Sequence, residues 1–208
     1  MVHKSFSVKE AFSFGWNTVL KNPVIVLYTL GVYGLSFVVS QILNTIFRVD
    51  AQETNFIISF LSTFITSFFW VGYLQVLFRL VEGKKIEINQ LISRDYKLVF
   101  FYALGTYIYV IGVLLGLVLL IVPGIIVGVA LSMWMYVLLT HKDMHVIDAF
   151  KKSWEITKGH RMQLFLMALA ALGVVLVGTL AILVGLLVAI PVIYLAFIHV
   201  YKKLSGSK

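Results

Sequence analysis

Long apolar stretches separated by short polar segments dominate this chain. The apolar stretches run over residues 23–47, 56–81, 98–140 and 164–200. A helix that crosses a bilayer needs about 20 predominantly apolar residues, so the first two stretches predict one span each and the last two predict a pair each. The pattern therefore predicts an all-α integral membrane protein with six transmembrane helices, in a single polytopic domain over residues 1–208.

The two longest stretches must each contain a reversal of the chain. Pro123-Gly124 divides the first of them, because proline and glycine interrupt helices. The reversal in the last stretch is expected between Gly178 and Gly185, where no charged residue marks it. Pro191 then falls inside the sixth helix and predicts a kink. The first apolar run has spanning length, which favours a retained helix over a signal peptide.

The polar segments that precede the hairpins have an amphipathic pattern. Ser7 and Glu10 have the spacing of a capping box, in which each side chain bonds the other residue's backbone N–H. A helix over about 8–20 would place its apolar side chains on one face and its polar side chains on the other. Such a helix is typical of a segment that lies in the headgroup plane of a membrane.

One spacing of apolar and aromatic residues occurs in three polar segments. The positions are Val8, Ala11, Phe12 and Trp16; Ile88, Leu91, Ile92 and Tyr96; and Val146, Ala149, Phe150 and Trp154. These sets suggest three repeats of an interfacial helix plus a hairpin, at about 5–81, 85–140 and 143–203. Coincidence is the alternative, because any amphipathic helix has apolar residues at such spacings. The interfacial anchors expected from the pattern are Phe12, Trp16, Ile92, Tyr96, Phe150 and Trp154.

Within the third segment, Asp148–Lys152 and Lys151–Glu155 are four residues apart and are expected to form ion pairs along a helix that ends at Gly159. The basic side chains on its polar face suit contact with anionic lipid, where each can contribute about 1 kcal/mol. The expected lipid contacts are Lys151, Lys152, Lys158 and Arg161.

Composition supports a membrane protein and sets its orientation. The chain is 61% hydrophobic and 12% charged, and it has no cysteine, which excludes disulfides and thiolate chemistry. Of the 17 Lys and Arg residues, 16 lie in segments on the N-terminal side of the predicted topology. The positive-inside rule then places both termini in the cytoplasm of a cell (inner) membrane. We interpret the net charge of +8 as contact with anionic lipids and not with nucleic acid.

Two groups of polar residues invite a chemical interpretation. Ser59, Ser62, Thr63 and Thr66 share one side of the second span. They either support close helix packing or line a polar path. His141, His145 and Asp148 could share a helix face as metal ligands, but no third strong ligand has a fixed spacing, so we predict neither metal nor cofactor. Motifs for a nucleophile elbow, a P-loop and HExxH are missing, and no charged residue lies mid-span.

The segments IVPGI at residues 121–125 and DAFKKSWEITKG at 148–159 carry a family resemblance. They resemble a group of uncharacterised prokaryotic membrane proteins that is similar to the membrane domain of glycerophosphodiester phosphodiesterases. The phosphodiesterase chemistry of that family resides in a separate soluble domain. The resemblance therefore implies the fold and no catalytic residue.

These observations predict a non-enzymatic membrane protein that takes part in lipid interaction, membrane organisation or scaffolding. One alternative is a transporter or channel for a neutral or amphipathic solute, and another is a membrane subunit of a larger complex. The pattern indicates no particular substrate, protein partner or oligomeric state.

Overall fold

The described part of the protein is α-helical. A computed structural model describes residues 6–47, 56–84, 92–141, 143–180 and 184–206, and these residues contain no strand. The helices are α1 (Val8–Lys21), α2 (Val24–Ile46), α3 (Phe56–Val81), α4 (Tyr96–Leu119), α5 (Ile121–Leu131), α6 (Trp134–Thr140), α7 (Val146–Thr157), α8 (Arg161–Leu180) and α9 (Val184–Ser205).

Six of the helical segments are long and apolar enough to cross a membrane, as predicted. Five are single helices and the remaining one, Ile121–Thr140, combines α5 and α6. Many large apolar side chains stay exposed, including Val118 at 83% and Leu180 at 84%. Water would oppose so much exposed apolar surface, whereas lipid accommodates it. The chain is therefore a multi-pass helical membrane protein.

The reversals of the chain agree with the prediction at one place and differ at another. Helix α8 ends at Leu180 and α9 begins at Val184, both inside the expected window of Gly178 to Gly185. In the third stretch the helix stops earlier than expected, at Leu120, which adopts an extended conformation. Pro123 then lies in the first turn of α5, where a proline is tolerated because its missing N–H would have had no partner in the helix.

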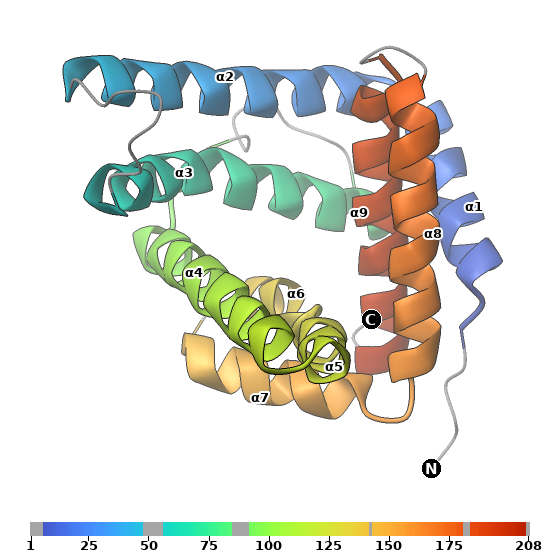
Figure 1. Ribbon diagram of the computed structural model, residues 1–208. Coiled ribbons are helices and arrows are strands. Elements are labelled where there is room, and N and C mark those ends of the chain that lie inside the picture. Colours follow the sequence, from blue (N-terminus) through green and yellow to red (C-terminus); the bar gives the residue numbers. More distant parts are fainter. Residues whose placement is uncertain (1–5, 48–55, 85–91, 142, 181–183, 207–208) are drawn as a thin grey trace.

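The helices run in two main directions (Figure 1). Helices α1, α8 and α9 lie side by side, while α2 and α3 run across them and contact α9 near their own ends. Helices that cross a bilayer tilt by about 20° from its normal on average. The candidate spans thus do not form one parallel bundle, although all are long enough to span.

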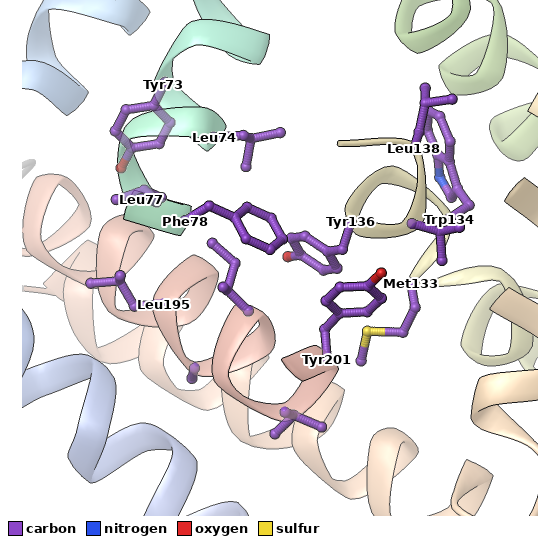
Figure 2. Close-up of a cluster of buried hydrophobic side chains, with 14 of the residues drawn as sticks. Tyr73, Leu74, Leu77, Phe78, Met133, Trp134, Tyr136, Leu138, Leu195 and Tyr201 are labelled. Carbon is purple, nitrogen blue, oxygen red and sulfur yellow. The ribbon is translucent and has the colours of Figure 1, made fainter. Parts of the chain in front are cut away.

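A buried cluster joins α3, α6 and α9 (Figure 2). Phe78 of α3 contacts the rings of Tyr136 and Tyr201 at centroid distances of 5.9 and 6.0 Å. Tyr136 and Tyr201 also contact each other at 5.8 Å. Because each ring comes from a different helix, this cluster holds the carboxyl end of α3 against α6 and α9.

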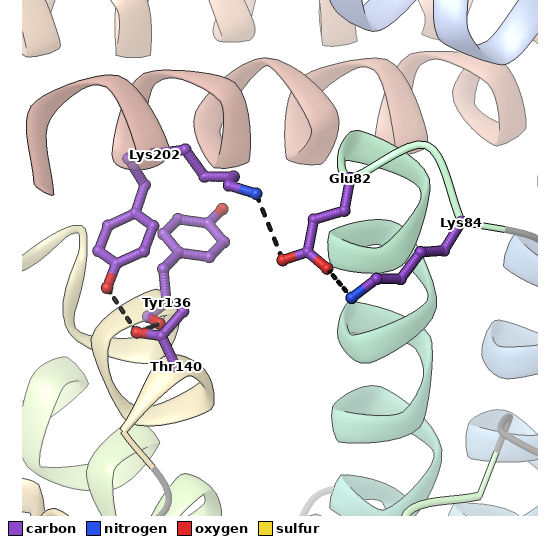
Figure 3. Close-up of polar contacts among 6 residues, drawn as sticks. Glu82, Lys84, Tyr136, Thr140 and Lys202 are labelled. Carbon is purple, nitrogen blue, oxygen red and sulfur yellow. Dashed lines mark hydrogen bonds and ion pairs between the residues drawn. The ribbon is translucent and has the colours of Figure 1, made fainter. Parts of the chain in front are cut away.

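Ion pairs connect the polar segments that charge had assigned to one side of the membrane. Glu82, just after α3, binds Lys202 of α9 at 3.3 Å and Lys84 at 2.6 Å (Figure 3). Its pKa is lowered, first by the hydrogen bond from Lys84 and also by Lys202. Lys97 at the start of α4 lies 3.8 Å from Asp143, in the segment between α6 and α7.

The capping box predicted at the start of α1 is wrong. Ser7 occupies the N-cap position but makes no side-chain capping bond. Glu10 instead accepts hydrogen bonds from Lys203 of α9, with both carboxylate oxygens 3.2 Å from Nζ. A charged partner on the neighbouring helix offers a stronger bond than a backbone N–H that faces solvent.

Helix α1 packs lengthwise against α9 in an antiparallel direction. Glu10 lies beside Lys203 near the end of α9, and Gly15 lies against the backbone of Val192, well before that end. A Cβ at Gly15 would overlap the carbonyl oxygen of Val192. The start of α1 is therefore near the end of α9, and its end approaches the beginning of α9 (Figure 1). The position of α1 in the headgroup plane stays a prediction.

Candidate functional site in helix α7

Helix α7 presents two different faces. The side chains that are buried against the rest of the protein are Val146, Ala149, Phe150, Ser153 and Thr157. Ile147 and Trp154 lie at the edge of this face and are 63% and 42% exposed, and the exposed charged side chains lie opposite it, at Asp148, Lys151, Lys152 and Glu155. The pattern of three and four residue steps produces these faces because a helix turns once every 3.6 residues.

The buried face bonds directly to a break in the fourth span. Helix α5 ends at Leu131 and α6 begins at Trp134, so the backbone between them lacks regular helical partners. Ser153 donates to the carbonyl oxygen of Ala130 at 3.0 Å and accepts from the N–H of Met133 at 3.2 Å. Thr157 donates to the same carbonyl oxygen at 3.0 Å.

These contacts explain the roles of Ser153 and Thr157, which the sequence analysis did not predict. Ser153 and Thr157 are fully buried on the apolar face of an amphipathic helix. Two hydroxyl residues four apart on such a face were the available signal, because buried hydroxyls need hydrogen-bond partners. Their partner, the break after Leu131, was not predicted.

Phe150 extends this contact into the core. Its ring lies 5.3 Å from the ring of Trp134, which in turn lies 5.8 Å from Tyr102 of α4. Trp134 is 2% exposed, and a Cβ at Gly105 of α4 would overlap its ring. Phe150 was expected to be a membrane anchor, but it is only 9% exposed and packs mainly inside the protein.

The exposed face combines an aromatic ring with cationic groups. The guanidinium carbon of Arg161 lies 4.1 Å from the centre of the Trp154 ring, a cation–π contact.

The ion pairs predicted along α7 are wrong in their partners. Lys151 pairs with Asp148 at 3.6 Å and Lys152 with Glu155 at 3.3 Å, so each pair is three residues apart, not four. Both spacings place side chains on one helical face.

Helix α7 ends close to Gly159, the residue at which the sequence predicts its end. The helix stops at Thr157, and Gly159 has a φ of 87°, a conformation that glycine adopts without steric cost. The turn that follows leads at once into α8 at Arg161. Lys158, Gly159 and the start of α8 therefore form a short, exposed junction.

The other expected anchors occupy varied positions. Trp16 is 50% exposed and Phe12 is half-buried on α1. Ile92 and Tyr96 are 53% and 72% exposed. Residues 93–95 are not helical and Tyr96 is the first residue of α4, so the helix expected to include Ile92 and Tyr96 does not extend unbroken to Tyr96. Ile88 and Leu91 lie outside the described residues.

The hydroxyl groups of the second span are half-buried, and two of them have partners. Thr63 shares a hydrogen bond of 3.0 Å with the hydroxyl of Tyr107 in α4. Thr66 donates to the backbone oxygen of Ser62 at 2.8 Å. Ser59 and the side chain of Ser62 lie along the same half-buried side of α3.

The histidines considered as metal ligands lie around an open cavity of about 580 Å³. It is lined by His141, Asp143, Met144, His145 and Asp148. Within the described ranges, no group of three His, Asp or Glu side chains is placed to hold a metal ion. Both carboxylates of the cavity are already close to lysines, Asp143 to Lys97 and Asp148 to Lys151.

Comparison with known proteins places this site within a recognised family. Residues 102–208 match the family described as "Protein of unknown function (DUF975)". The chain belongs to that family. The DUF975 match begins in α4 and includes all of α5 to α9, and so covers the whole α7 site. No curated protein and no solved structure matches the chain. The DUF975 match lends no support to a resemblance to glycerophosphodiester phosphodiesterases.

Proposed function

We propose that this protein is a non-enzymatic, multi-pass protein of the cell (inner) membrane that binds anionic lipids through α7 and thereby organises the surrounding membrane or scaffolds partner proteins. The observation that carries this proposal is the division of α7 into two faces. One face is bonded to the protein interior through Ser153 and Thr157. The other exposes lysines and a tryptophan, the residue types favoured at the lipid headgroups.

Cytoplasmic termini are part of the proposal. The ion pairs Glu10–Lys203, Glu82–Lys202 and Lys97–Asp143 connect segments that the positive-inside rule assigns to the cytoplasm. A cytoplasmic leaflet rich in anionic lipid attracts basic residues. The same assignment places α7 where its lysines meet that leaflet.

Internal repetition also belongs to the proposal. Helices α1 and α7 share the residues Ala-Phe-x-x-x-Trp. In each helix, the side that carries the alanine is buried against other helices of the protein. We treat residues 5–81, 85–140 and 143–203 as three related units of a single domain. The hydroxyl bond between Thr63 and Tyr107 of α4 favours helix packing over the alternative of a solute path along the second span.

The proposal is tested by lipid selectivity in bilayers. The full-length protein is reconstituted with spin-labelled phosphatidylglycerol or spin-labelled phosphatidylcholine, and the fraction of lipid immobilised by the protein is measured. We expect the wild type to prefer phosphatidylglycerol. The variant Lys151→Glu/Lys158→Glu should reduce that preference by about 30-fold, because each of the two basic residues near anionic lipid contributes about 1 kcal/mol.

The variant Lys9→Glu/Lys21→Glu is the matched control, since it changes the net charge equally on α1. Its effect on selectivity should be smaller than that of the α7 variant. Equal immobilisation of the two lipids by the wild-type protein would disprove the proposed function.

A further inference from the structure

The junction between α7 and α8 contains cationic groups that have no acidic partner. Lys151 and Lys152 are paired with carboxylates of their own helix. Among the ion pairs of the described ranges, none includes Lys158 or Arg161. The Nε atom of Arg161 is also buried without a hydrogen-bond partner. Two positive charges thus lie at one turn, Lys158 exposed and Arg161 half-buried, and no carboxylate in the described part of the chain pairs with them.

Trp154 holds the Arg161 side chain in a defined orientation. The guanidinium lies over the indole ring at 4.1 Å. Stacking engages the flat face of the guanidinium, and because Nε is buried, the N–H groups that can meet an anion are those of its two terminal nitrogens. A planar guanidinium with free edges matches two oxygens of a phosphate group. The contact therefore prepares Arg161 for a phosphate more than for a single carbonyl.

Apolar surface surrounds these charges. Trp154 is 42% exposed, and Met162, the residue after Arg161, is 71% exposed. Ile147 is 63% exposed and lies two turns before Trp154 on the same face of α7. A free phosphate ion would gain nothing from these side chains, whereas the chains of a phospholipid would cover them.

We propose that the α7–α8 junction binds the phosphate group of an anionic phospholipid, with Arg161 and Lys158 as its cationic partners and Trp154 against the glycerol and the upper part of an acyl chain. This inference rests on the proposed function and assigns one site to it. The N–H groups at the start of α8 add a favourable field for the same phosphate. The Gly159 turn brings that helix start close behind α7.

The test measures binding of a soluble lipid to the full-length protein in detergent. Dihexanoyl phosphatidylglycerol is titrated, and the tryptophan emission of the wild type is compared with that of Trp154→Phe to isolate the signal of Trp154. Arg161→Gln should weaken binding by about tenfold, as expected for the loss of a charge-assisted hydrogen bond. Arg161→Lys should recover only part of the affinity because it keeps the charge and loses the planar fork.

Lys84→Gln is the control, since it removes one charge that is paired with Glu82 and lies outside α7 and α8. It should leave the affinity within twofold of the wild type. An equal loss in Arg161→Gln and Lys84→Gln would overturn the site while leaving a preference for anionic lipid, and so the proposed function, intact. Unfolding temperatures of both variants show whether a loss of binding comes from misfolding.

Inorganic phosphate and dihexanoyl phosphatidylcholine distinguish the possible ligands. Both should bind at least tenfold more weakly than dihexanoyl phosphatidylglycerol, because one lacks the chains and the other carries a compensating positive charge. Equal binding of inorganic phosphate would overturn a lipid site in favour of a simple anion site. Phosphatidylcholine has the same phosphodiester, so its equal binding would show that the net negative charge of the lipid does not direct binding, which contradicts an anionic lipid as the ligand.

Discussion

Helices α1 and α7 carry the same sequence pattern, but their buried faces contact different structures. The alanine of each pattern, Ala11 or Ala149, is fully buried. The tryptophan of each, Trp16 or Trp154, stays about half exposed. The shared aromatic residue therefore marks the exposed edge of each helix, and the shared alanine marks the line of contact.

The contact lines diverge one turn after the alanine. In α1 this position is Gly15, which allows the backbone of α9 to approach at Val192. In α7 it is Ser153, whose hydroxyl bonds the broken backbone after Leu131. Close approach needs the absence of a side chain, whereas a helix break needs a donor and an acceptor. The small residue at this position of the pattern therefore differs between the helices: glycine permits the close approach in α1, and serine supplies the donor and the acceptor in α7.

The largest expected effect comes from filling the α1 contact. Gly15→Leu should destabilise the protein by about 3 kcal/mol, because the new side chain meets backbone atoms of α9 that cannot rotate away. Thermal unfolding in detergent measures the change. Gly31→Leu in α2 is the matched control, since a Cβ there has no neighbour within 4 Å.

The control variant should be neutral or slightly stabilising, because leucine favours a helix more than glycine does. If both leucine variants unfold at the same temperature, α1 does not pack closely on α9, and the contrast between the two helices disappears.

The corresponding change in α7 removes atoms instead of adding them. Ser153→Ala should cost about 2 kcal/mol, because the buried N–H of Met133 loses its acceptor and the carbonyl of Ala130 loses one donor. Chemical or thermal unfolding in detergent again provides the measurement. Ser13→Ala on the exposed side of α1 is the control and should change stability by less than about 0.5 kcal/mol. A neutral Ser153→Ala variant would mean that the break does not depend on α7.

Sequence reasoning succeeded where the signal was local. The spans follow from uninterrupted apolar runs, so the second span was placed at 56–81 and α3 is Phe56–Val81. It failed where the partner lay far along the chain. Glu10 was predicted to form a capping box with Ser7, three residues away, but its partner Lys203 is 193 residues away. No local pattern indicates which distant charge a carboxylate will meet.

The α7 site shows the same limit. Its amphipathic face could be predicted because it depends only on helical periodicity. The stacking of Arg161 on Trp154 depends on the turn at Gly159, which brings α8 back toward α7. The exchange of ion-pair partners in α7 reflects side-chain rotamers, which residue spacing does not decide.

Acid should affect α1 through Glu10. Its pKa lies below the ordinary value of 4.5 because of the hydrogen bond and charge of Lys203. A lowered pKa in the folded state stabilises the folded state above the unfolded pKa, and this contribution is lost as the pH falls through the lowered value. We therefore expect α1 to loosen only below pH 4.5. The emission of Trp16, isolated by difference from Trp16→Phe, measures the change.

Lys203→Gln should remove this part of the acid dependence and leave the rest of the titration in place. Lys151→Gln, which breaks an ion pair confined to α7, is the control and should leave the Trp16 curve unchanged. A Lys203→Gln curve identical to that of the wild type would show that Glu10 does not hold α1 in place.

The smallest perturbation tests where each helix lies relative to the membrane. The chain has no cysteine, so a single introduced cysteine is the only thiol. Lys9→Cys and Lys21→Cys mark the ends of α1, and Asp148→Cys and Glu155→Cys mark α7. All four positions are exposed, so each change should shift stability by less than about 0.5 kcal/mol.

A membrane-impermeant maleimide is added to the cytoplasmic face of sealed vesicles. Both α7 positions should react at similar rates, because a helix in the headgroup plane presents both ends to the same side. In α1, Lys9→Cys should react faster than Lys21→Cys, because antiparallel packing on α9 places Lys21 farther from the end of α9 that carries Lys203. Equal labelling at both ends of α1 would indicate that α1 lies in the headgroup plane, and the difference between α1 and α7 would then lie only in what their small residues contact.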